Sequence, residues 1–239
     1  MERKLNGVVL RSVPYGENDA ILTFFTLEEG VVSAKIKGVK KAGAKLKFAT
    51  QPFCFAELVV LRTGDKNSVI NAALHDGFYP LRENVFSFYA GSVMLEFIYK
   101  FATYTVEKEE LFNLLIKSLN ALCYGSDTPE KVLTGFLFKA LSFIGYGISV
   151  KACARCGGEI KGRTFFSVSE GAFFCSECAD ADSFEIYPST YDTLAKISEE
   201  KEITERESLK NALKLLHFFL ERKTETEIKA LKEFVALLK

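Results

Sequence analysis

The sequence predicts a multi-domain α+β protein, in which a small β-barrel precedes an α-helical domain that carries a four-cysteine module. Three observations predict this class. Apolar residues alternate in short runs up to about residue 80, and beyond it they recur about every 3.6 residues. Two CxxC pairs then interrupt the helical part. We therefore expect one domain over residues 1–80 and a second over 81–239, with the module inserted at about 151–182.

The first eighty residues predict five short strands. They are rich in Val, Ile, Phe and Thr, and turn sequences such as Glu28-Glu29-Gly30 separate them. Five strands joined mostly by hairpins favour a small barrel. The expected strands are Gly7–Val13, Ala20–Thr26, Val31–Lys37, Phe53–Arg62 and Ser68–Leu74.

The barrel region carries the local positive charge of a chain whose net charge is zero. Residues 1–80 hold 11 Lys and Arg against 8 Asp and Glu, whereas residues 81–239 hold 20 against 23. No acidic residue lies between Val31 and Ala56, where six lysines gather: Lys35, Lys37, Lys40, Lys41, Lys45 and Lys47. A positive groove on a small barrel attracts phosphates without reading sequence. The alternative is a merely solvated lysine loop, and composition alone does not separate the two.

Beyond Tyr79-Pro80 the pattern predicts helices. One has Tyr89, Val93, Phe97 and Phe101 at four-residue steps, a second starts near Leu111, and a third spans Phe136 to Ile144 and ends at Gly145-Tyr146-Gly147. Two further helices follow the cysteine module. Their apolar stripes are Leu209, Leu213, Leu216 and Leu220, then Ile228, Leu231, Val235 and Leu238.

Eighteen residues separate Cys153-Ala-Arg-Cys156 from Cys175-Ser-Glu-Cys178, which is the spacing of a zinc ribbon. We expect one structural Zn²⁺ bound by all four thiolates, because a filled tetrahedron leaves no position for water or substrate. A dithiol redox centre is the alternative, but it needs one CxxC near a βαβ pattern, which is absent here. Nearby cations can offset the charge of the site: Lys151, Arg155, Lys161 and Arg163. Cys54 and Cys123 lie in apolar runs and are expected to be structural.

Enzymatic chemistry has little support in the sequence. It holds two histidines, His75 and His217, and no P-loop, Rossmann fingerprint, GxSxG elbow or HExxH motif. Glu17 and Asp19 lie in a turn, where acids are more often solvated or capping than catalytic. No apolar run is long enough to span a membrane, and thiolates at a metal site suit a reducing cytoplasm.

Motifs in order along the chain resemble the RecO family of bacterial recombination mediators. In the barrel region they are Tyr15-Gly16-Glu17-Asn18-Asp19, Thr26 to Gly30, Lys37-Gly38-Val39-Lys40-Lys41 and Gln51-Pro52-Phe53. Further along they are Leu141 to Tyr146, the CxxCGG at Cys153–Gly158, Phe166-Ser167 and Gly171 before Cys175. The resemblance covers nearly the whole chain, and the final helices match it only loosely.

The resemblance implies an N-terminal OB-fold, a helical C-terminal domain and a zinc module. It implies a non-enzymatic mediator in DNA repair and the RecF pathway of recombination, which is cytoplasmic and associated with the nucleoid. Such proteins bind single- and double-stranded DNA and anneal complementary single strands. Together with RecR they help to load RecA on strands coated by single-strand-binding protein (SSB). The SSB tail is acidic and ends in apolar residues, so its site is expected to be an apolar groove with a basic rim on the helical domain.

The family's basic motif falls on Lys37, Lys40, Lys41 and Lys45, which are expected to contact phosphate. Lys35, Lys47 and Arg11 are further DNA-binding candidates. The chain departs from the family pattern at Ala44, where a small hydroxyl residue is usual, and at Thr50, where Leu is usual. Lysines in place of the family's frequent arginines give up bidentate binding, so we expect weaker and more salt-sensitive DNA binding.

Two other readings of the sequence remain open. A zinc-stabilised protein-interaction adaptor would have a basic loop that binds no nucleic acid, and a salt titration of DNA binding separates it from a mediator. A nuclease would need a carboxylate cluster for a metal, which the sequence does not suggest.

Overall fold

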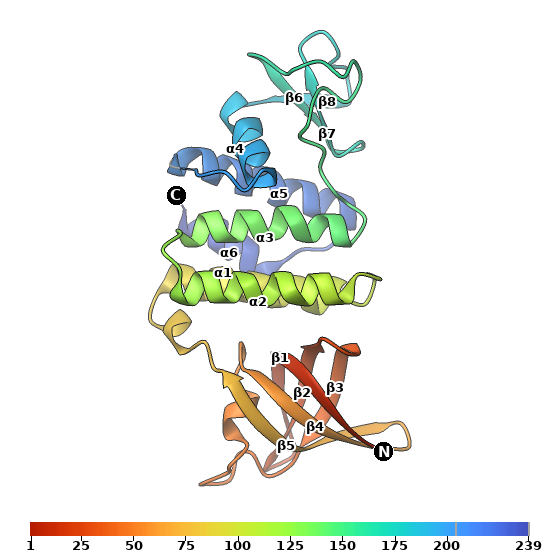
Figure 1. Cartoon of the computed structure of the whole chain (residues 1–239), viewed down its shortest axis with the longest axis vertical. Coiled ribbons are helices and arrows are strands. Elements are labelled where there is room, and N and C mark those ends of the chain that lie inside the picture. The colour runs from red at the N-terminus through yellow and green to blue at the C-terminus, as the bar shows by residue number, and fades with distance from the viewer. Residues whose placement is uncertain (204, 239) are drawn as a thin grey trace. The chain divides into compact units, whose positions relative to one another are not determined.

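The computed structural model of the protein describes residues 1–203 and 205–238 and is drawn in Figure 1. The chain forms two compact units, Met1–Tyr124 and Gly125–Lys239. In these described residues the first unit contains the barrel and two α-helices, and the second contains four α-helices and a small sheet. Among the described residues, no helix combines the length and the apolar character that a membrane span needs.

The barrel is closed by five strands in the order β1-β2-β3-β5-β4, with β4 pairing back to β1. All pairs are antiparallel except β3 with β5. This is the topology of an OB-fold, so the predicted barrel and its five strands are confirmed. The strands are β1 Glu2–Tyr15, β2 Asp19–Thr26, β3 Gly30–Ile36, β4 Phe55–Thr63 and β5 Lys66–Asp76.

One long strand, β1, closes the barrel by pairing on both sides. Its first half pairs with β4 and its second half with β2, and the register shifts between Val9 and Arg11. Such a bulge bends a strand, which lets one strand serve two partners. Gly7 lies where the two pairings overlap, and a Cβ there would come within 3.1 Å of the Phe25 carbonyl oxygen.

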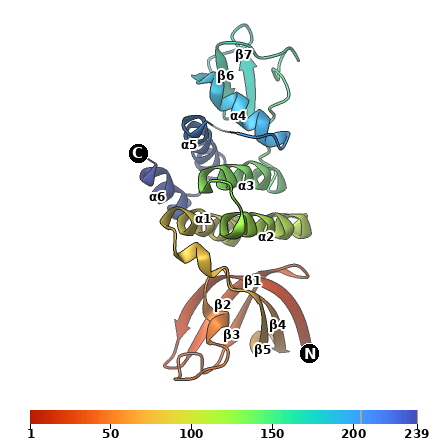
Figure 2. The same cartoon turned by 60° about the vertical axis from the view of Figure 1, so that its left-hand side comes forward.

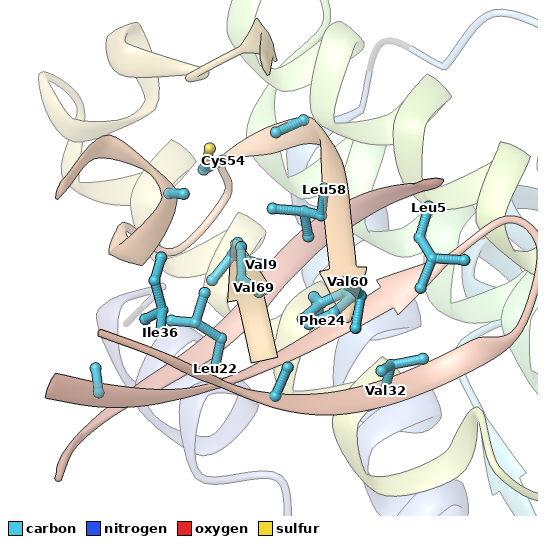
Figure 3. Packing of buried hydrophobic residues seen from close by; sticks show 14 of the residues in the cluster. Leu5, Val9, Leu22, Phe24, Val32, Ile36, Cys54, Leu58, Val60 and Val69 are labelled. Atoms are coloured by element: carbon cyan, nitrogen blue, oxygen red, sulfur yellow. The ribbon is translucent and has the colours of Figure 1, made fainter. Parts of the chain in front are cut away.

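Alternating apolar residues from all five strands fill the barrel interior, as Figure 3 shows. Leu22, Phe24, Ile36, Leu58 and Val60 are completely buried. Burial of such side chains contributes about 1.5–3 kcal/mol each. The expected start of the fourth strand at Phe53 was two residues early, because Phe53 has a left-handed φ of 71° and its ring is buried.

Two helices complete the first unit, α1 Val85–Phe101 and α2 Lys108–Tyr124. Asn84 caps α1, since its side-chain oxygen accepts a hydrogen bond from the Ser87 amide at 3.0 Å. The change from strands to helices falls at the 3₁₀ turn η2, Tyr79–Arg82, whereas the compact units divide at Tyr124. The division into two domains at residue 80 therefore stays a prediction.

The second unit has the helices α3 Pro129–Phe143, α4 Pro188–Ser198, α5 Arg206–Thr224 and α6 Lys229–Leu237. Gly145 ends α3 with φ +83°, as the sequence predicted. The four leucines of the first predicted stripe are buried in α5, and three of the four residues of the second are buried around α6. Helix α4 was missed because its buried face includes Thr190 and Thr193, which weaken the apolar pattern.

Candidate nucleic-acid interface and metal centre

The lysine loop, residues 37–47, is held at its start by the turn between β1 and β2. Asp19 bonds to Lys35 Nζ at 2.7 Å and accepts the Gly38 amide hydrogen at 2.9 Å. The hydrogen bond from Lys35 and that from the Gly38 amide hold the pKa of Asp19 below its ordinary value. The Lys40 amide donates to the Asn18 carbonyl at 3.1 Å. Asp19 thus anchors the loop, a structural role for one of the two acids in this turn.

The predicted DNA-binding cations differ in what they already bind. Lys35 pairs with Asp19 and lies 4.7 Å from the centre of the Tyr15 ring, and Lys40 donates to the Gly16 carbonyl at 3.2 Å. Four exposed lysines have no ion pair or side-chain hydrogen bond within the described part of the chain: Lys37, Lys41, Lys45 and Lys47. Their ammonium groups are free to neutralise phosphates.

A groove of about 470 Å³ lies under the lysine loop. Lys40 and Lys47 line it together with polar and apolar groups: Ser12, Pro14, Ala20, Val39, Thr50, Gln51 and Pro52. Cations beside small apolar surfaces suit the sugar-phosphate backbone of DNA. Binding of that backbone needs positive charge and close contact, but no hydrogen bonds to particular bases. Of the predicted lysines, the structure brings two into one groove.

Arg11 lies on β1 outside this groove. Its guanidinium carbon is 5.7 Å from the centre of the Tyr99 ring of α1, and its Nη1 donates to the Tyr99 hydroxyl at 3.3 Å. The prediction of a phosphate contact for Arg11 is untested. Sequence reasoning missed Tyr99 and Tyr15 as partners of these cations, although Tyr15 opens the motif in the first turn.

The four predicted metal ligands meet in one cluster. The sulfur atoms of Cys153, Cys156, Cys175 and Cys178 all lie within 4.8 Å of one another, and Cys156 Sγ is 3.9 Å from Cys175 Sγ. A tetrahedral ion with 2.3 Å bonds to sulfur needs edges of about 3.8 Å. The donor set suits a zinc ion, and the distance between Cys156 and Cys175 is close to that edge.

Local backbone structure positions both cysteine pairs. The Cys153 amide donates to the Gly158 carbonyl at 2.9 Å, and Gly157 has φ +70° and donates to the Cys153 carbonyl. A glycine thus supplies the left-handed residue of the first turn. Cys175 ends strand β7, in a sheet ordered β7-β6-β8 with bounds Ala172–Cys175, Thr164–Ser167 and Ser183–Ile186. The sheet thus extends four residues beyond the predicted end of the module at 182.

Thiol ionisation in the cluster is uneven. Burial opposes ionisation of Cys153, but backbone amides of Cys156, Cys175 and Arg155 outweigh it and lower its pKa to about 6. Hydrogen bonding to Cys175, followed by burial, raises the pKa of Cys178 to about 12. The charge of the Cys153 thiolate adds to the rise at Cys178, since like charges this close repel. A divalent cation removes that repulsion, so the cluster is suited to hold one.

Three basic residues of the module bind carboxylates or carbonyls of their own. Arg155 donates to the Cys178 carbonyl at 2.6 Å and pairs with Asp180, which holds the pKa of that carboxyl below its ordinary value. Arg163 binds both Glu185 oxygens, at 2.8 and 2.9 Å, and Lys161 pairs with Glu159 at 2.9 Å. These cations are engaged in the fold.

The remaining cysteines and histidines have structural environments. Cys54 is buried in the barrel core, and burial raises its pKa to about 11. Cys123 is half-buried, and burial raises its pKa as well. His75 bonds to the Asn6 side-chain oxygen at 2.9 Å, and His217 lies 3.1 Å from Glu221 one turn along α5.

The second unit carries an apolar groove of about 570 Å³ between strand β8 and helix α5. Its walls include the exposed rings of Phe184, Tyr187 and Phe218, with Lys214 at the rim. The buried hydroxyl of Thr190 lies in the wall without a hydrogen-bond partner in the described structure. Sequence reasoning expected such a groove but named none of its residues, which come from β8, the start of α4 and helix α5.

Comparison with known proteins now adds to this geometry. The family model described as Recombination protein O N terminal matches residues 1–78, and that described as Recombination protein O C terminal matches residues 82–232. The chain belongs to the RecO family. The predicted family resemblance is confirmed, and membership supports a role in DNA repair.

Similar curated proteins carry the name DNA repair protein RecO. That of Caldicellulosiruptor saccharolyticus is 31% identical over 183 residues, which are 77% of this chain and 75% of the relative. The proteins of Desulforamulus reducens and Clostridium novyi are each 30% identical and cover 74% and 80% of this chain and 68% and 75% of their own length. The barrel, the helical region and the cysteine cluster described above thus belong to a chain of the RecO family.

Proposed function

We propose that this protein is a non-enzymatic recombination mediator of the cytoplasm and nucleoid that binds single- and double-stranded DNA and anneals complementary single strands. With RecR it helps to load RecA on strands coated by SSB. One observation supports the DNA-binding part above all: on an OB-fold barrel, the loop that carries four unpaired lysines also borders a groove, which Lys40 and the unpaired Lys47 line. The partnerships with RecR and RecA rest on family membership.

Annealing needs two polyanions to approach each other. Lysines that replace condensed counterions on one strand lower the repulsion toward the second strand, and they do so for every sequence alike. No nucleotide or divalent-metal chemistry is required. The effect must weaken as salt rises, because released counterions then gain less entropy.

The proposed cofactor is one structural Zn²⁺ held by Cys153, Cys156, Cys175 and Cys178. The support is the convergence of four sulfurs at a spacing that suits a tetrahedral ion. Four thiolates complete the coordination shell, so the ion would hold the module folded and would offer no position for a reacting water.

For the SSB tail we propose the groove between β8 and α5. Its rings can take the apolar end of the tail, and Lys214 can pair with tail carboxylates. Arg222, stacked 5.5 Å over the Phe218 ring one turn further along α5, extends the basic rim. The acid in the lining, Glu185, is already bound by Arg163.

A labelled peptide with the acidic, apolar-ended sequence of an SSB tail tests this site. We expect Phe218→Ala and Lys214→Glu each to weaken binding at least tenfold, and Tyr104→Ala in the first unit to leave it unchanged. Equal binding by all variants would place the tail elsewhere.

The decisive experiment for the function is annealing of complementary single strands, bare and precoated with SSB, followed with donor and acceptor dyes. We expect the protein to accelerate both reactions without nucleotide or Mg²⁺, and added salt to reduce the acceleration. If the protein binds single strands but leaves both rates unchanged, the mediator proposal fails. If it binds no DNA at all, the zinc-stabilised adaptor takes its place.

A further inference from the structure

The outer face of the barrel beside the lysine loop presents a row of exposed side chains. Along β1 the bulge after Val9 leaves Arg11, Val13 and Tyr15 on one face, because strand residues alternate between faces. Val9 and Leu22, by contrast, point into the core. We call the outward row, with Tyr99 of α1 and Lys35 of β3, the tyrosine face. Strand β1 and helix α1 can be followed in Figure 2.

A tyrosine with a cation beside its ring marks each end of this face. Lys35 Nζ lies 4.7 Å from the Tyr15 ring centre, and the Arg11 guanidinium carbon lies 5.7 Å from that of Tyr99. Tyr15 is 53% exposed and Tyr99 40% exposed, so each ring still offers surface to a ligand.

The tyrosine face adjoins the lysine loop through bonded contacts. Asp19 binds both Lys35 of the face and the Gly38 amide of the loop, and Pro14, next to Tyr15, lines the groove under the loop. Thr23 of β2 pairs in register with Arg11, and its hydroxyl lies 3.3 Å from that of Ser33 on β3. A DNA strand whose phosphates bind the lysine loop would therefore lie next to the rings and hydroxyls of the tyrosine face.

We infer that Tyr15 and Tyr99 are stacking platforms for unpaired bases and give this site its preference for single strands. Single-strand sites combine a cationic groove with aromatic rings, since every base has a π-face whatever its sequence. A duplex keeps its bases stacked inside and cannot use the rings. Lys35 and Arg11 then act mainly by holding the rings in place, and the loop lysines carry the phosphates. This inference rests on the proposed DNA binding and adds the residues that recognise bases.

The test uses the full-length protein and three ligands of equal length: oligo(dT), an abasic single strand and a duplex. The double variant Tyr15→Ala, Tyr99→Ala should bind oligo(dT) about 100-fold more weakly, at about tenfold for each lost base stack. Its affinity for the abasic strand and the duplex should stay within twofold of wild type. The salt dependence of oligo(dT) binding should not change, because no charge is removed.

Two further variants separate stacking from folding. Tyr15→Phe with Tyr99→Phe keeps both rings and should bind oligo(dT) as wild type does, and Tyr104→Ala removes a tyrosine that is 79% exposed and distant in sequence from the loop. Equal losses on the oligo(dT) and abasic strands would overturn the inference and assign the tyrosines to loop anchoring. Unchanged oligo(dT) binding would overturn it too. If wild type binds none of the three ligands, the proposed function fails first.

Discussion

The barrel and the cysteine module reach stable folds by different means. The barrel buries apolar side chains from all five strands in one closed core. The module has three strands of four residues each, too little to enclose a core of comparable size, and it brings four sulfurs together instead. An apolar core needs no ligand, whereas a thiolate cluster needs its metal. The two regions should therefore respond differently to the same perturbation.

The same two regions also differ in how they use positive charge. In the module Arg155, Lys161 and Arg163 each bind a carboxylate. In the lysine loop four ammonium groups have no such partner within the described residues. Paired cations stabilise the fold and are poorly available to a ligand, whereas unpaired cations repel one another until an anion arrives. A count of Lys and Arg along the sequence does not make this distinction, but the contacts do.

The largest expected effect is loss of the module when a metal ligand is removed. Structural zinc sites in small peptides contribute about 10–16 kcal/mol of folding free energy. Cys175→Ser should therefore lose the metal and leave residues 151–186 unprotected in hydrogen exchange, with protection of β1 to β5 unchanged. The matched control is Cys123→Ser, a half-buried cysteine outside the cluster, which should keep one zinc per chain.

Metal analysis and peptide-resolved hydrogen exchange would measure both variants. Equal loss of protection in the module and in the barrel would show that the two regions are not independent. Protein purified without chelator that contained no zinc would contradict the proposed cofactor directly.

A core substitution should produce the opposite pattern. Leu58→Ala removes a completely buried side chain of the barrel and should lower the free energy of unfolding by about 2–5 kcal/mol. Urea unfolding followed by circular dichroism measures the loss, and zinc content should stay at one per chain. If Leu58→Ala also lost its metal, the barrel core and the cysteine cluster would not be stabilised independently of each other.

Removal of cations from the lysine loop and from the cysteine module should affect DNA binding differently. Lys40→Ala with Lys41→Ala should weaken binding to all sequences, and the log–log salt slope for single strands should become shallower by about 1.4, at about 0.7 per phosphate contact. Lys161→Ala with Arg163→Ala removes the same charge from the module and should leave the slope unchanged. An unaltered slope in the first variant would show that Lys40 and Lys41 contact no phosphate and that the loop is merely solvated.

Much of the fold could be predicted from the sequence, because its signals are local. The five strands follow from the alternation of apolar residues, and Gly145 and Gly157 mark turns that only a left-handed residue makes easily. The four-cysteine cluster, which could hold a metal, was equally visible, since the spacing of two CxxC pairs is itself the signal. In these cases the information lies within a few residues of the feature.

What the sequence did not reveal depends on contacts between distant positions. Arg11 and Tyr99 are 88 residues apart, and no spacing rule links them. Likewise the alternation on β3 does not tell whether its lysine is paired, since the partner of Lys35 is Asp19, the first residue of the neighbouring strand β2. Asp19 itself was recognisable as a turn residue, but its hold on the lysine loop required the fold.

The smallest predicted effect concerns this anchor and tests whether pairing keeps a cation from DNA. Asp19→Asn removes the charge that pairs with Lys35 and keeps an oxygen that can accept the Gly38 amide. The released Lys35 can then reach phosphate, so the salt slope for single strands should become steeper by up to about 0.7.

The folded pKa of Asp19 lies below its ordinary value of 3.8, so its contribution to stability is present above that pH and is lost as pH falls through the lowered value. The variant should therefore be less stable than wild type at pH 7, and the difference should vanish in strong acid. Urea unfolding at several pH values measures it, and a constant difference down to the lowest pH would show that the anchor does not act through charge.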